Sequence, residues 1–225
     1  MLPLITIGDI HLYTYPLVIG LALSLFYTLA DFHHDQEGKP LKSFSIFWLG
    51  LVITSFICAK LLFYLTYQKE IALLDFFLSG GGLVFYGGIL GGLFYLFSYG
   101  KLFGKKLEDF KFLVPALCFS HAIGRIGCFL AGCCYGKACH LAWAVEGRHP
   151  VQLYEAFFLF LFGIIFLQKK WRSFKTYLFA YAGLRFILEF FRGDEVRGLW
   201  FGFSTSQLIA LAIILSLLLN RKFRA

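Results

Sequence analysis

The sequence predicts an all-α membrane protein with seven transmembrane helices, an extracytoplasmic N-terminus and a cytoplasmic C-terminus. Three observations predict this fold class: the composition, the spacing of apolar segments and the distribution of Lys and Arg. Hydrophobic residues make up 59% of the 225 residues and charged residues 15%, whereas soluble domains contain roughly 45–50% and 25%. The mean hydropathy is +0.74. These values exclude a soluble enzyme, a secreted disulfide-rich domain and a disordered chain.

Seven segments supply the roughly 20 apolar residues that a helix needs to cross a bilayer. We expect residues 1–225 to form a single polytopic transmembrane domain. Glycines crowd the third segment, among them Gly87 and Gly88, and small residues let neighbouring helices approach closely. Helix packing and substrate binding both remain open for these glycines. The segments lie near residues 14–30, 44–66, 82–100, 112–131, 151–167, 176–192 and 203–220.

Basic residues gather on one side of the predicted membrane. The loops after spans one, three and five, together with the C-terminal tail, hold 13 Lys and Arg, against 5 on the other side. The positive-inside rule therefore places the N-terminus outside. Because these bases lie in short loops between apolar segments, the net charge of +8 gives no support to nucleic-acid binding.

Three bases lie within predicted spans: Lys60, Arg125 and Arg185. A charge at the centre of a membrane helix costs about 2.5–3.5 kcal/mol on insertion scales, so it is a functional hypothesis by default. We expect Lys60 to reach an interface with its long side chain. Arg125 and Arg185 have polar residues around them and are therefore the better candidates for a site.

The sixth segment places Tyr181, Arg185, Glu189 and Arg192 on one helical face, at i, i+4, i+8 and i+11. One interpretation is a structural Arg185–Glu189 pair that faces the bundle. The other is an anion site, since a guanidinium offers a planar fork of donors that fits phosphate oxygens. Two arginines with one carboxylate between them would leave positive charge to spare.

Neighbouring stretches add further polar groups. Glycines around Arg125, from Gly124 to Gly136, favour a broken or re-entrant backbone that lines a cavity. Glu155 lies one turn into the fifth span, where it is a candidate ion-pair partner for an arginine. Polar residues from several segments fall in the outer halves of their spans, which predicts a shared cavity suited to a lipid phosphate. These residues are Tyr15, Tyr86, Arg125, Gln152, Glu155, Arg185 and Glu189.

The six cysteines leave several interpretations open. Two of them, Cys58 and Cys118, lie inside spans and are expected to be packing residues. The other four lie in or beside a predicted extracytoplasmic loop, where oxidation favours a disulfide. The adjacent Cys133 and Cys134 would pair more easily with another cysteine, for example Cys139, than with each other. The C-x4-C-C-x4-C-H spacing of the four matches no common metal motif, so a metal site or a nucleophilic cysteine is the less favoured alternative. These four are Cys128, Cys133, Cys134 and Cys139.

Four stretches of the chain together resemble the prolipoprotein diacylglyceryl transferase family, in an order that covers essentially the whole sequence. GRIGCFLAGCCYG (Gly124–Gly136) is similar to the family signature, and HPVQLYE (His149–Glu155) is similar to its HPxQLYE motif. YAGLRFILEFFR (Tyr181–Arg192) resembles the late arginine-containing helix. GGLVFYGGILGG (Gly81–Gly92) resembles the third-span histidine–glycine–glycine motif.

The resemblance implies a multi-pass enzyme of the bacterial cytoplasmic (inner) membrane. Such enzymes move a diacylglyceryl group from phosphatidylglycerol to the lipobox cysteine thiol of a preprolipoprotein, and glycerol-1-phosphate leaves. Since the nucleophilic thiol belongs to the acceptor, the resemblance implies no cofactor and no metal. Arg125, Arg185 and Tyr86 are expected to be catalytic. The implied substrate-binding residues are Tyr15, Gly87, Gly88, Cys128, Gly136, His149, Gln152, Tyr154, Glu155, Tyr181, Glu189 and Arg192.

The sequence departs from the family's pattern in three places. Tyr86 stands where the family has a histidine, and Cys128 and Cys133 stand where it has an asparagine and a glutamate. The loop from Gly136 to His149 is shorter than in many members. A divergent transferase with another acceptor or lipid, and a non-catalytic lipid-binding or transport protein, are therefore alternative hypotheses.

Overall fold

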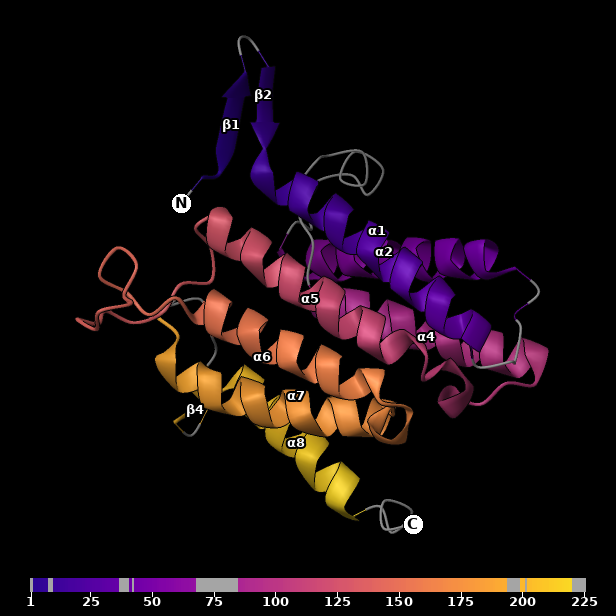
Figure 1. The fold of residues 1–225 in the computed structure, drawn as a ribbon. Coiled ribbons are helices and arrows are strands. Elements are labelled where there is room, and N and C mark those ends of the chain that lie inside the picture. Colours follow the sequence, from indigo (N-terminus) through magenta and orange to yellow (C-terminus); the bar gives the residue numbers. More distant parts are fainter. Residues whose placement is uncertain are drawn as a thin grey trace. The chain divides into compact units, whose positions relative to one another are not determined.

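The structure is a computed structural model that describes residues 2–7, 10–36, 41, 43–67, 85–193, 199–200 and 202–219. Within these residues the chain forms an α-helix at each of the seven predicted positions, which confirms the predicted all-α architecture (Figure 1). The helices are α1 (Thr14–Gln36), α2 (Phe44–Tyr67), α4 (Phe85–Phe103), α5 (Leu113–Leu130), α6 (Val151–Leu167), α7 (Phe174–Leu188) and α8 (Thr205–Leu219).

Several short elements complete the described chain, and two antiparallel hairpins among them were not predicted. In the first hairpin Leu4 pairs with Tyr13, and the β-branched Ile5 and Thr6 have the side chains that strands favour. These elements are the 3-10 helices η1 (Leu107–Phe110), η2 (Lys169–Trp171) and η3 (Glu189–Phe191), and the strands β1 (Leu4–Ile7), β2 (Ile10–Tyr13), β3 (Leu199–Trp200) and β4 (Phe203–Ser204).

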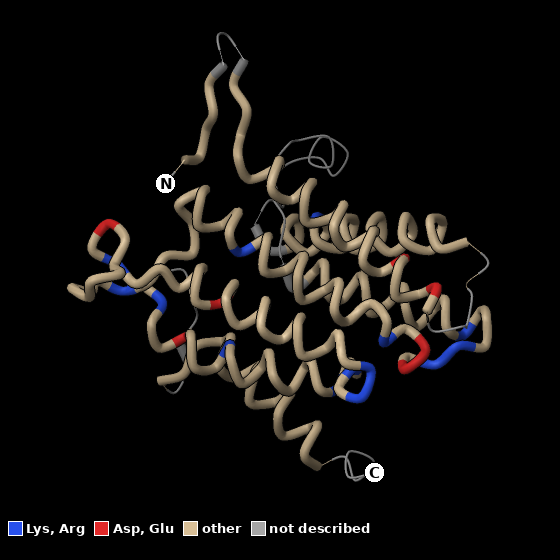
Figure 2. Tube along the Cα trace, viewed as in Figure 1, with Lys and Arg blue, Asp and Glu red and all other residues tan. Residues whose placement is uncertain are grey.

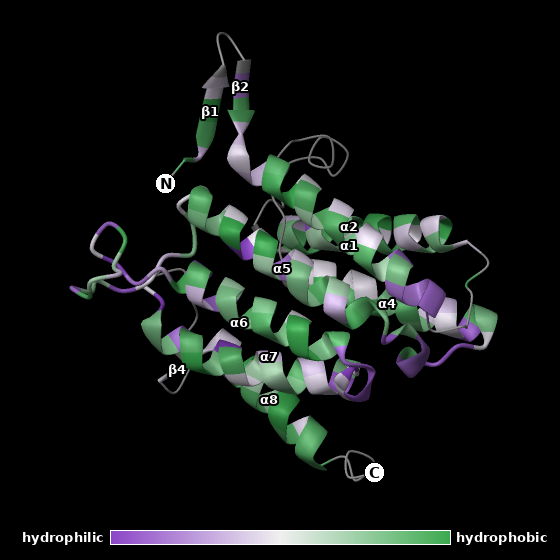
Figure 3. Ribbon diagram, viewed as in Figure 1, coloured by the Kyte–Doolittle hydropathy of each residue, from purple (hydrophilic) through white to green (hydrophobic). Residues whose placement is uncertain are grey.

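The helices have the composition of membrane-embedded segments. Three of them, α1, residues Phe44–Leu65 of α2 and α5, are long and apolar enough to cross a bilayer, and α6 and α8 are shorter apolar helices. Figure 3 shows hydrophobic residues along most of every helix, with hydrophilic stretches after α4 and after α6. The charged residues in Figure 2 follow the same distribution and lie mainly in the connections. The chain is therefore a membrane-embedded helical protein.

The chain forms two compact units. The terminal unit contains residues Met1–His33 and Lys111–Ala225, and the central unit contains His34–Phe110. In the terminal unit α5, α6, α7 and α8 pack against one another in sequence order (Figure 1). Gly163 of α6 faces α5 so closely that a Cβ there would lie 2.8 Å from the Phe119 ring.

Helix α1 packs on the C-terminal half of α5 within the terminal unit. A Cβ on Gly127 would lie 3.0 Å from Val18 of α1. The backbone N–H of Leu2 donates a hydrogen bond of 3.0 Å to the carbonyl of Leu130, which fastens the start of the chain to the end of α5. Helix α1 and the start of the chain thus lie against the end of α5.

The central unit is built on the close pairing of α2 with α4. A Cβ on Gly87 would lie 2.5 Å from the carbonyl oxygen of Cys58, and one on Gly91 would lie 2.6 Å from that of Thr54. This supports helix packing as the role of these glycines. Lys60 is 3% exposed, so the expectation that its side chain reaches an interface is not supported.

Candidate functional site

A buried carboxylate lies at the centre of the candidate site. Glu155 is in the second turn of α6, which starts directly after Pro150, and its side chain is 1% exposed. A carboxylate buried this deeply needs positive or hydrogen-bonding partners, because burial of an unpaired charge is costly. Partners from two other helices surround Glu155.

Two arginines converge on a single oxygen of this carboxylate. Arg125 of α5 binds Glu155 Oε2 through Nη2, and Arg185 of α7 approaches the same oxygen through Nη1 at 3.4 Å. Their side chains are 12% and 14% exposed. The two guanidinium groups therefore share one carboxylate oxygen, and the charge of Glu155 offsets the repulsion between them.

The second oxygen of Glu155 has its own partners. The Tyr181 hydroxyl of α7 donates a hydrogen bond of 3.0 Å to Glu155 Oε1. His121 of α5 lies with Nε2 at 3.8 Å from the same oxygen and 5.1 Å from Tyr181 between ring centroids. Sequence reasoning missed His121, although its position four residues before Arg125 places it on the same face of α5.

Two carboxylates offset the charge of Arg125 and Arg185 in this cluster. Arg185 also pairs with Glu189 through Nη2 at 3.2 Å, so Arg125 and Arg185 face two carboxylates. The spare positive charge expected of Arg185 and Arg192, with Glu189 between them, stays a prediction. In addition, Arg125 Nε is buried and has no hydrogen-bond partner within the described residues.

The side chains of the HPVQLYE motif lie in two environments, the protein interior and the loop before α6. Gln152 is buried, and its Nε2 donates a 2.6 Å hydrogen bond to the carbonyl of Cys133. His149 and Tyr154 instead face the loop before α6, where Tyr154 Oη lies 3.3 Å from His149 Nδ1 and accepts a 2.9 Å hydrogen bond from Trp143. Helical periodicity thus assigns Gln152 and Glu155 to the interior and Tyr154 to the loop.

Gly136 and Arg192 lie where this loop meets the end of η3. They face each other in an isolated antiparallel bridge, and Lys137 donates a backbone hydrogen bond of 2.8 Å to Phe191. A Cβ on Gly136 would lie 2.4 Å from the carbonyl of His149. Gly136 is therefore needed for the close approach of three backbone segments, and its contact with substrate stays a prediction.

Four of the predicted site residues lie on α1 and α4, outside the Glu155 cluster. The ring of Tyr15 in α1 lies against Gly127 of α5, where an added Cβ would be 3.5 Å away. Tyr86 is in the first turn of α4, but its side chain lies outside the described residues. Gly87 and Gly88 lie in the α2–α4 pair. Substrate contacts for these four residues stay predictions.

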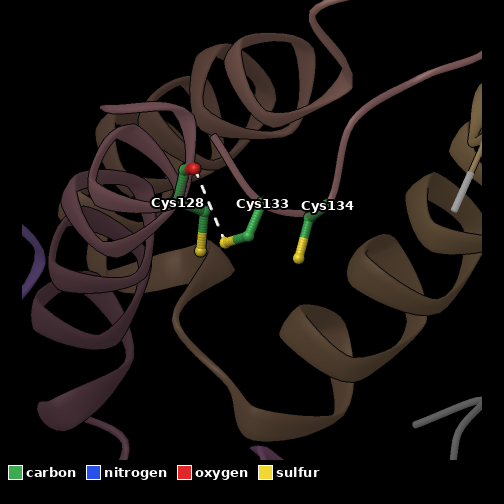
Figure 4. Close-up of side chains that lie close together, drawn as sticks. All are labelled: Cys128, Cys133 and Cys134. Atoms are coloured by element: carbon green, nitrogen blue, oxygen red, sulfur yellow. Dashed lines mark hydrogen bonds between the residues drawn. The ribbon is translucent and has the colours of Figure 1, made fainter. Parts of the chain in front are cut away.

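Three cysteines form a second cluster next to the arginines (Figure 4). The Sγ atoms of Cys128, Cys133 and Cys134 all lie within 4.8 Å of one another. All six cysteines are free thiols, so the favoured disulfide was wrong. Cys139 is buried elsewhere in the loop, where its N–H donates a 2.9 Å hydrogen bond to Gly147.

The three thiols of this cluster shift one another's pKa. Hydrogen bonds from Cys128 and Cys133 to the Cys134 sulfur hold the pKa of the Cys134 thiol well below its ordinary value, and the positive charges of Arg125 and Arg192 act in the same direction. The pKa of the Cys133 thiol is raised, because its hydrogen bonds with Cys128 and Cys134 favour the protonated form and burial acts in the same direction.

The fold and the site define a class: a membrane-embedded helical protein with a buried cluster of two arginines and two glutamates. The family model described as prolipoprotein diacylglyceryl transferase matches residues 3–220. This chain belongs to the prolipoprotein diacylglyceryl transferase family.

Three relatives carry the name phosphatidylglycerol–prolipoprotein diacylglyceryl transferase. The protein from Clostridium tetani is 38% identical over 60% of this chain and 61% of its own length. A protein from Clostridium perfringens, numbered 2 in its name, is 31% identical over 94% of this chain and 91% of its own length. The protein from Idiomarina loihiensis is 31% identical over 92% and 85% of the respective chains.

Proposed function

We propose that this chain transfers a diacylglyceryl group from phosphatidylglycerol to the cysteine thiol of a preprolipoprotein. Membership of the family supports the activity. The observation that carries the proposal is the convergence of Arg125 and Arg185, from two different helices, on Glu155 Oε2. A structural pair needs one arginine, whereas two guanidinium groups at one point form a site for an anion that has several oxygens.

The lipid phosphate is the anion that suits these arginines. Each guanidinium carries five N–H donors, and the contacts with Glu155 and Glu189 occupy only part of them. The buried Arg125 Nε–H is one donor that a phosphate oxygen can take. Glu155 thus orients both groups before the lipid arrives, which reduces the cost of ordering them on binding.

The same arginines favour the reaction itself. The acceptor sulfur forms a bond to the terminal glyceryl carbon while the bond between that carbon and the phosphate oxygen breaks, and the electron pair stays on the phosphate. The phosphodiester carries one negative charge, and the departing glycerol-1-phosphate gains a second. Arginines fixed in a low-dielectric site bind this developing charge more strongly than the ground state, which lowers the barrier.

The topology that fits this chemistry has seven spans in one polytopic domain, with the N-terminus outside and the C-terminus in the cytoplasm. The 13 to 5 distribution of Lys and Arg supports this orientation. It puts the ends of α5 and α7 and the start of α6 on the outer side, where a secreted acceptor with a lipobox cysteine arrives. We propose the bacterial inner membrane as the location and membrane phosphatidylglycerol as the donor.

The test is a transfer assay with the full chain in nanodiscs that contain phosphatidylglycerol, to which a lipobox peptide is added. Arg185→Lys keeps the charge and removes the planar fork, and we expect it to lower kcat about 100- to 1,000-fold. Arg148→Lys, an exposed arginine of the loop, is the matched control and should keep near-normal activity.

Either of two results contradicts the proposal. Near-normal activity of Arg185→Lys would remove the anion-binding role of the arginines. No thioether product from the folded wild-type chain, beside an active relative, would instead favour a different acceptor or lipid binding without catalysis.

A further inference from the structure

The three cysteines next to the arginines have no part in the reaction described above. Cys128 lies in the last turn of α5, and Cys133 and Cys134 follow it in the connection to α6. Figure 4 shows the three sulfur atoms on the same side of this connection, and they lie within 4.8 Å of one another. Three soft ligands at such distances have the composition of a site for a thiophilic metal ion.

The backbone holds the three sulfur atoms together. After α5 the chain turns back on itself: the N–H of Cys133 donates a 3.1 Å hydrogen bond to the carbonyl of Cys128, and the Cys133 Sγ lies 3.5 Å from the same oxygen. Gly132 and Cys134 both have positive φ, of 75° and 61°. For a cysteine this is an uncommon conformation, which persists only where the surroundings fix it.

The neighbours of this turn fix it from both sides. Gln152 of α6 donates to the carbonyl of Cys133 at 2.6 Å. Gly193 donates to the carbonyl of Tyr135 at 3.1 Å, and Gly136 donates to the carbonyl of His149 at 3.1 Å. The cysteines are thus attached to α5, α6 and the end of η3, so the cluster is a built feature and not a chance meeting of loop side chains.

The dimensions suit Zn²⁺. With Zn–S bonds of about 2.3 Å, tetrahedral geometry puts ligand sulfurs about 3.8 Å apart, so sulfurs within 4.8 Å need to move by roughly 1 Å at most. Three protein ligands leave a fourth position open, as in catalytic zinc sites. Arg125 Nη1 lies 3.8 Å from Cys128 Sγ and offsets the negative charge of the thiolates.

We infer that Cys128, Cys133 and Cys134 bind Zn²⁺ and that the open fourth position takes the thiol of the acceptor cysteine. The second part of this inference rests on the proposed transferase function. It differs from the expectation, drawn from the family resemblance, that the protein needs no metal. The site lies beside Arg125, which contacts both Cys128 and Glu155, so a thiol bound there would be next to the anion site.

The metal would supply the thiolate that the transfer requires. A thiol that binds Zn²⁺ loses its proton at neutral pH, and that proton passes to water. The sulfur electron pair then forms the bond to the glyceryl carbon while the carbon–oxygen bond breaks and its electron pair leaves with the phosphate. The neutral thioether is a weaker ligand than the thiolate, so the product can leave the metal.

Metal binding is tested first, without lipid or acceptor. The reduced, metal-free full chain is titrated with Zn²⁺, and with Co²⁺ as a spectroscopic probe whose thiolate-to-cobalt absorption reports sulfur ligands. We expect one equivalent of metal in the wild type and at least 100-fold weaker binding in Cys134→Ser. Cys139→Ser, a free cysteine of the same loop, is the matched control and should bind as the wild type does.

Two results would overturn the metal site. One is a wild-type chain that retains no Zn²⁺ and shows no cobalt–thiolate absorption. The other is a Cys134→Ser variant that binds metal as tightly as Cys139→Ser. Thermal unfolding of Cys134→Ser in detergent shows whether it is folded, and Cys133→Ser provides a second variant if it is not.

The role of the fourth position is tested separately. Adding a lipobox peptide to the cobalt-loaded chain should increase the thiolate absorption, and a peptide with serine in place of its cysteine should not. Zn²⁺ removal should abolish transfer, and re-addition should restore it. Transfer that persists in metal-free protein would overturn the role of the metal in activating the acceptor thiol, but not the metal site itself. Metal binding without any transfer would count against the proposed transferase function and leave the metal site in place.

Discussion

Two helix pairs of this protein make close contact through glycine and yet bury different groups. In the central unit, Gly87 and Gly91 of α4 lie directly against backbone carbonyls of α2. In the terminal unit, Gly163 of α6 lies against the ring of Phe119 in α5, and the same two helices bury the Arg125–Glu155 pair. Close helix packing is therefore common to both pairs, and the second pair also holds the buried Arg125–Glu155 ion pair.

The difference shows what the helix sequences can and cannot reveal. A glycine-rich stretch such as Gly87–Gly92 indicates close approach, and the backbone contacts account for Gly87 and Gly91 without a ligand. A buried Glu155 with partners on α5 and α7 has no such packing explanation, because an apolar residue would fill the space at lower cost. Functional interpretation should therefore follow the buried charges.

The largest effect is expected from Glu155→Gln. The substitution leaves Arg125 and Arg185 facing each other without a carboxylate between them, and breaking a buried ion pair in this way costs about 3–5 kcal/mol. We expect a lower melting temperature in detergent and no measurable transfer. Glu108→Gln, an exposed glutamate of η1, is the control. A stable and active Glu155→Gln protein would remove Glu155 from the centre of the site.

The next effect concerns the central unit, where Gly87→Ala and its neighbour Gly88→Ala form a matched pair. A Cβ on Gly87 would lie 2.5 Å from a backbone carbonyl, whereas one on Gly88 meets its nearest atom at 3.9 Å. We expect Gly87→Ala to lower stability by about 1–3 kcal/mol, as overpacking does. Gly88→Ala should be neutral or slightly stabilising, since alanine favours a helix.

The same pair separates packing from substrate binding. Thermal unfolding measures the first, and transfer per folded molecule measures the second. Reduced transfer by a fully stable Gly88→Ala protein would show that Gly88 contacts substrate. Equal stability of the two variants would contradict the packing role of Gly87.

Tyr181→Phe should have a smaller effect on the arginine cluster. It removes the hydroxyl that donates to Glu155 Oε1 at 3.0 Å and leaves both arginine contacts on Oε2 in place. A hydrogen bond to a charged group contributes about 1.5–3 kcal/mol, so we expect transfer to fall roughly 10- to 100-fold. Tyr13→Phe, an exposed tyrosine of β2, is the control. An unchanged rate would show that the arginines alone position Glu155.

The sequence was sufficient for the helices and for part of the site. The length of an apolar run is set by the membrane, so α6 was predicted as 151–167 and is observed at Val151–Leu167. The sixth span was predicted as 176–192, whereas α7 covers Phe174–Leu188. It starts earlier because Ser173 caps its first turn, and the chain tightens into η3 after Leu188.

The contacts between segments could not be predicted from spacing. Arg185 and Glu189 are one helical turn apart, so their pairing was proposed, but Glu155 is 30 residues away from both arginines in sequence. The cysteine cluster lies in a tight turn in which Gly132 and Cys134 have positive φ. The sulfur atoms lie within 4.8 Å of one another, and the positions of the cysteines in the sequence did not predict this turn. His121 belongs to no motif and was missed for that reason.

His121 gives the smallest expected effect and the sharpest test of what the network does. Its Nε2 lies 3.8 Å from Glu155 Oε1, beyond a good hydrogen bond, so His121→Asn should lower transfer less than about fivefold, or roughly 1 kcal/mol. His140→Asn, an exposed histidine of the loop, is the control. A loss above 100-fold at unchanged melting temperature would mean that the imidazole handles a proton. The acceptor thiol would then be deprotonated within the arginine cluster, and the cysteine cluster would have another role.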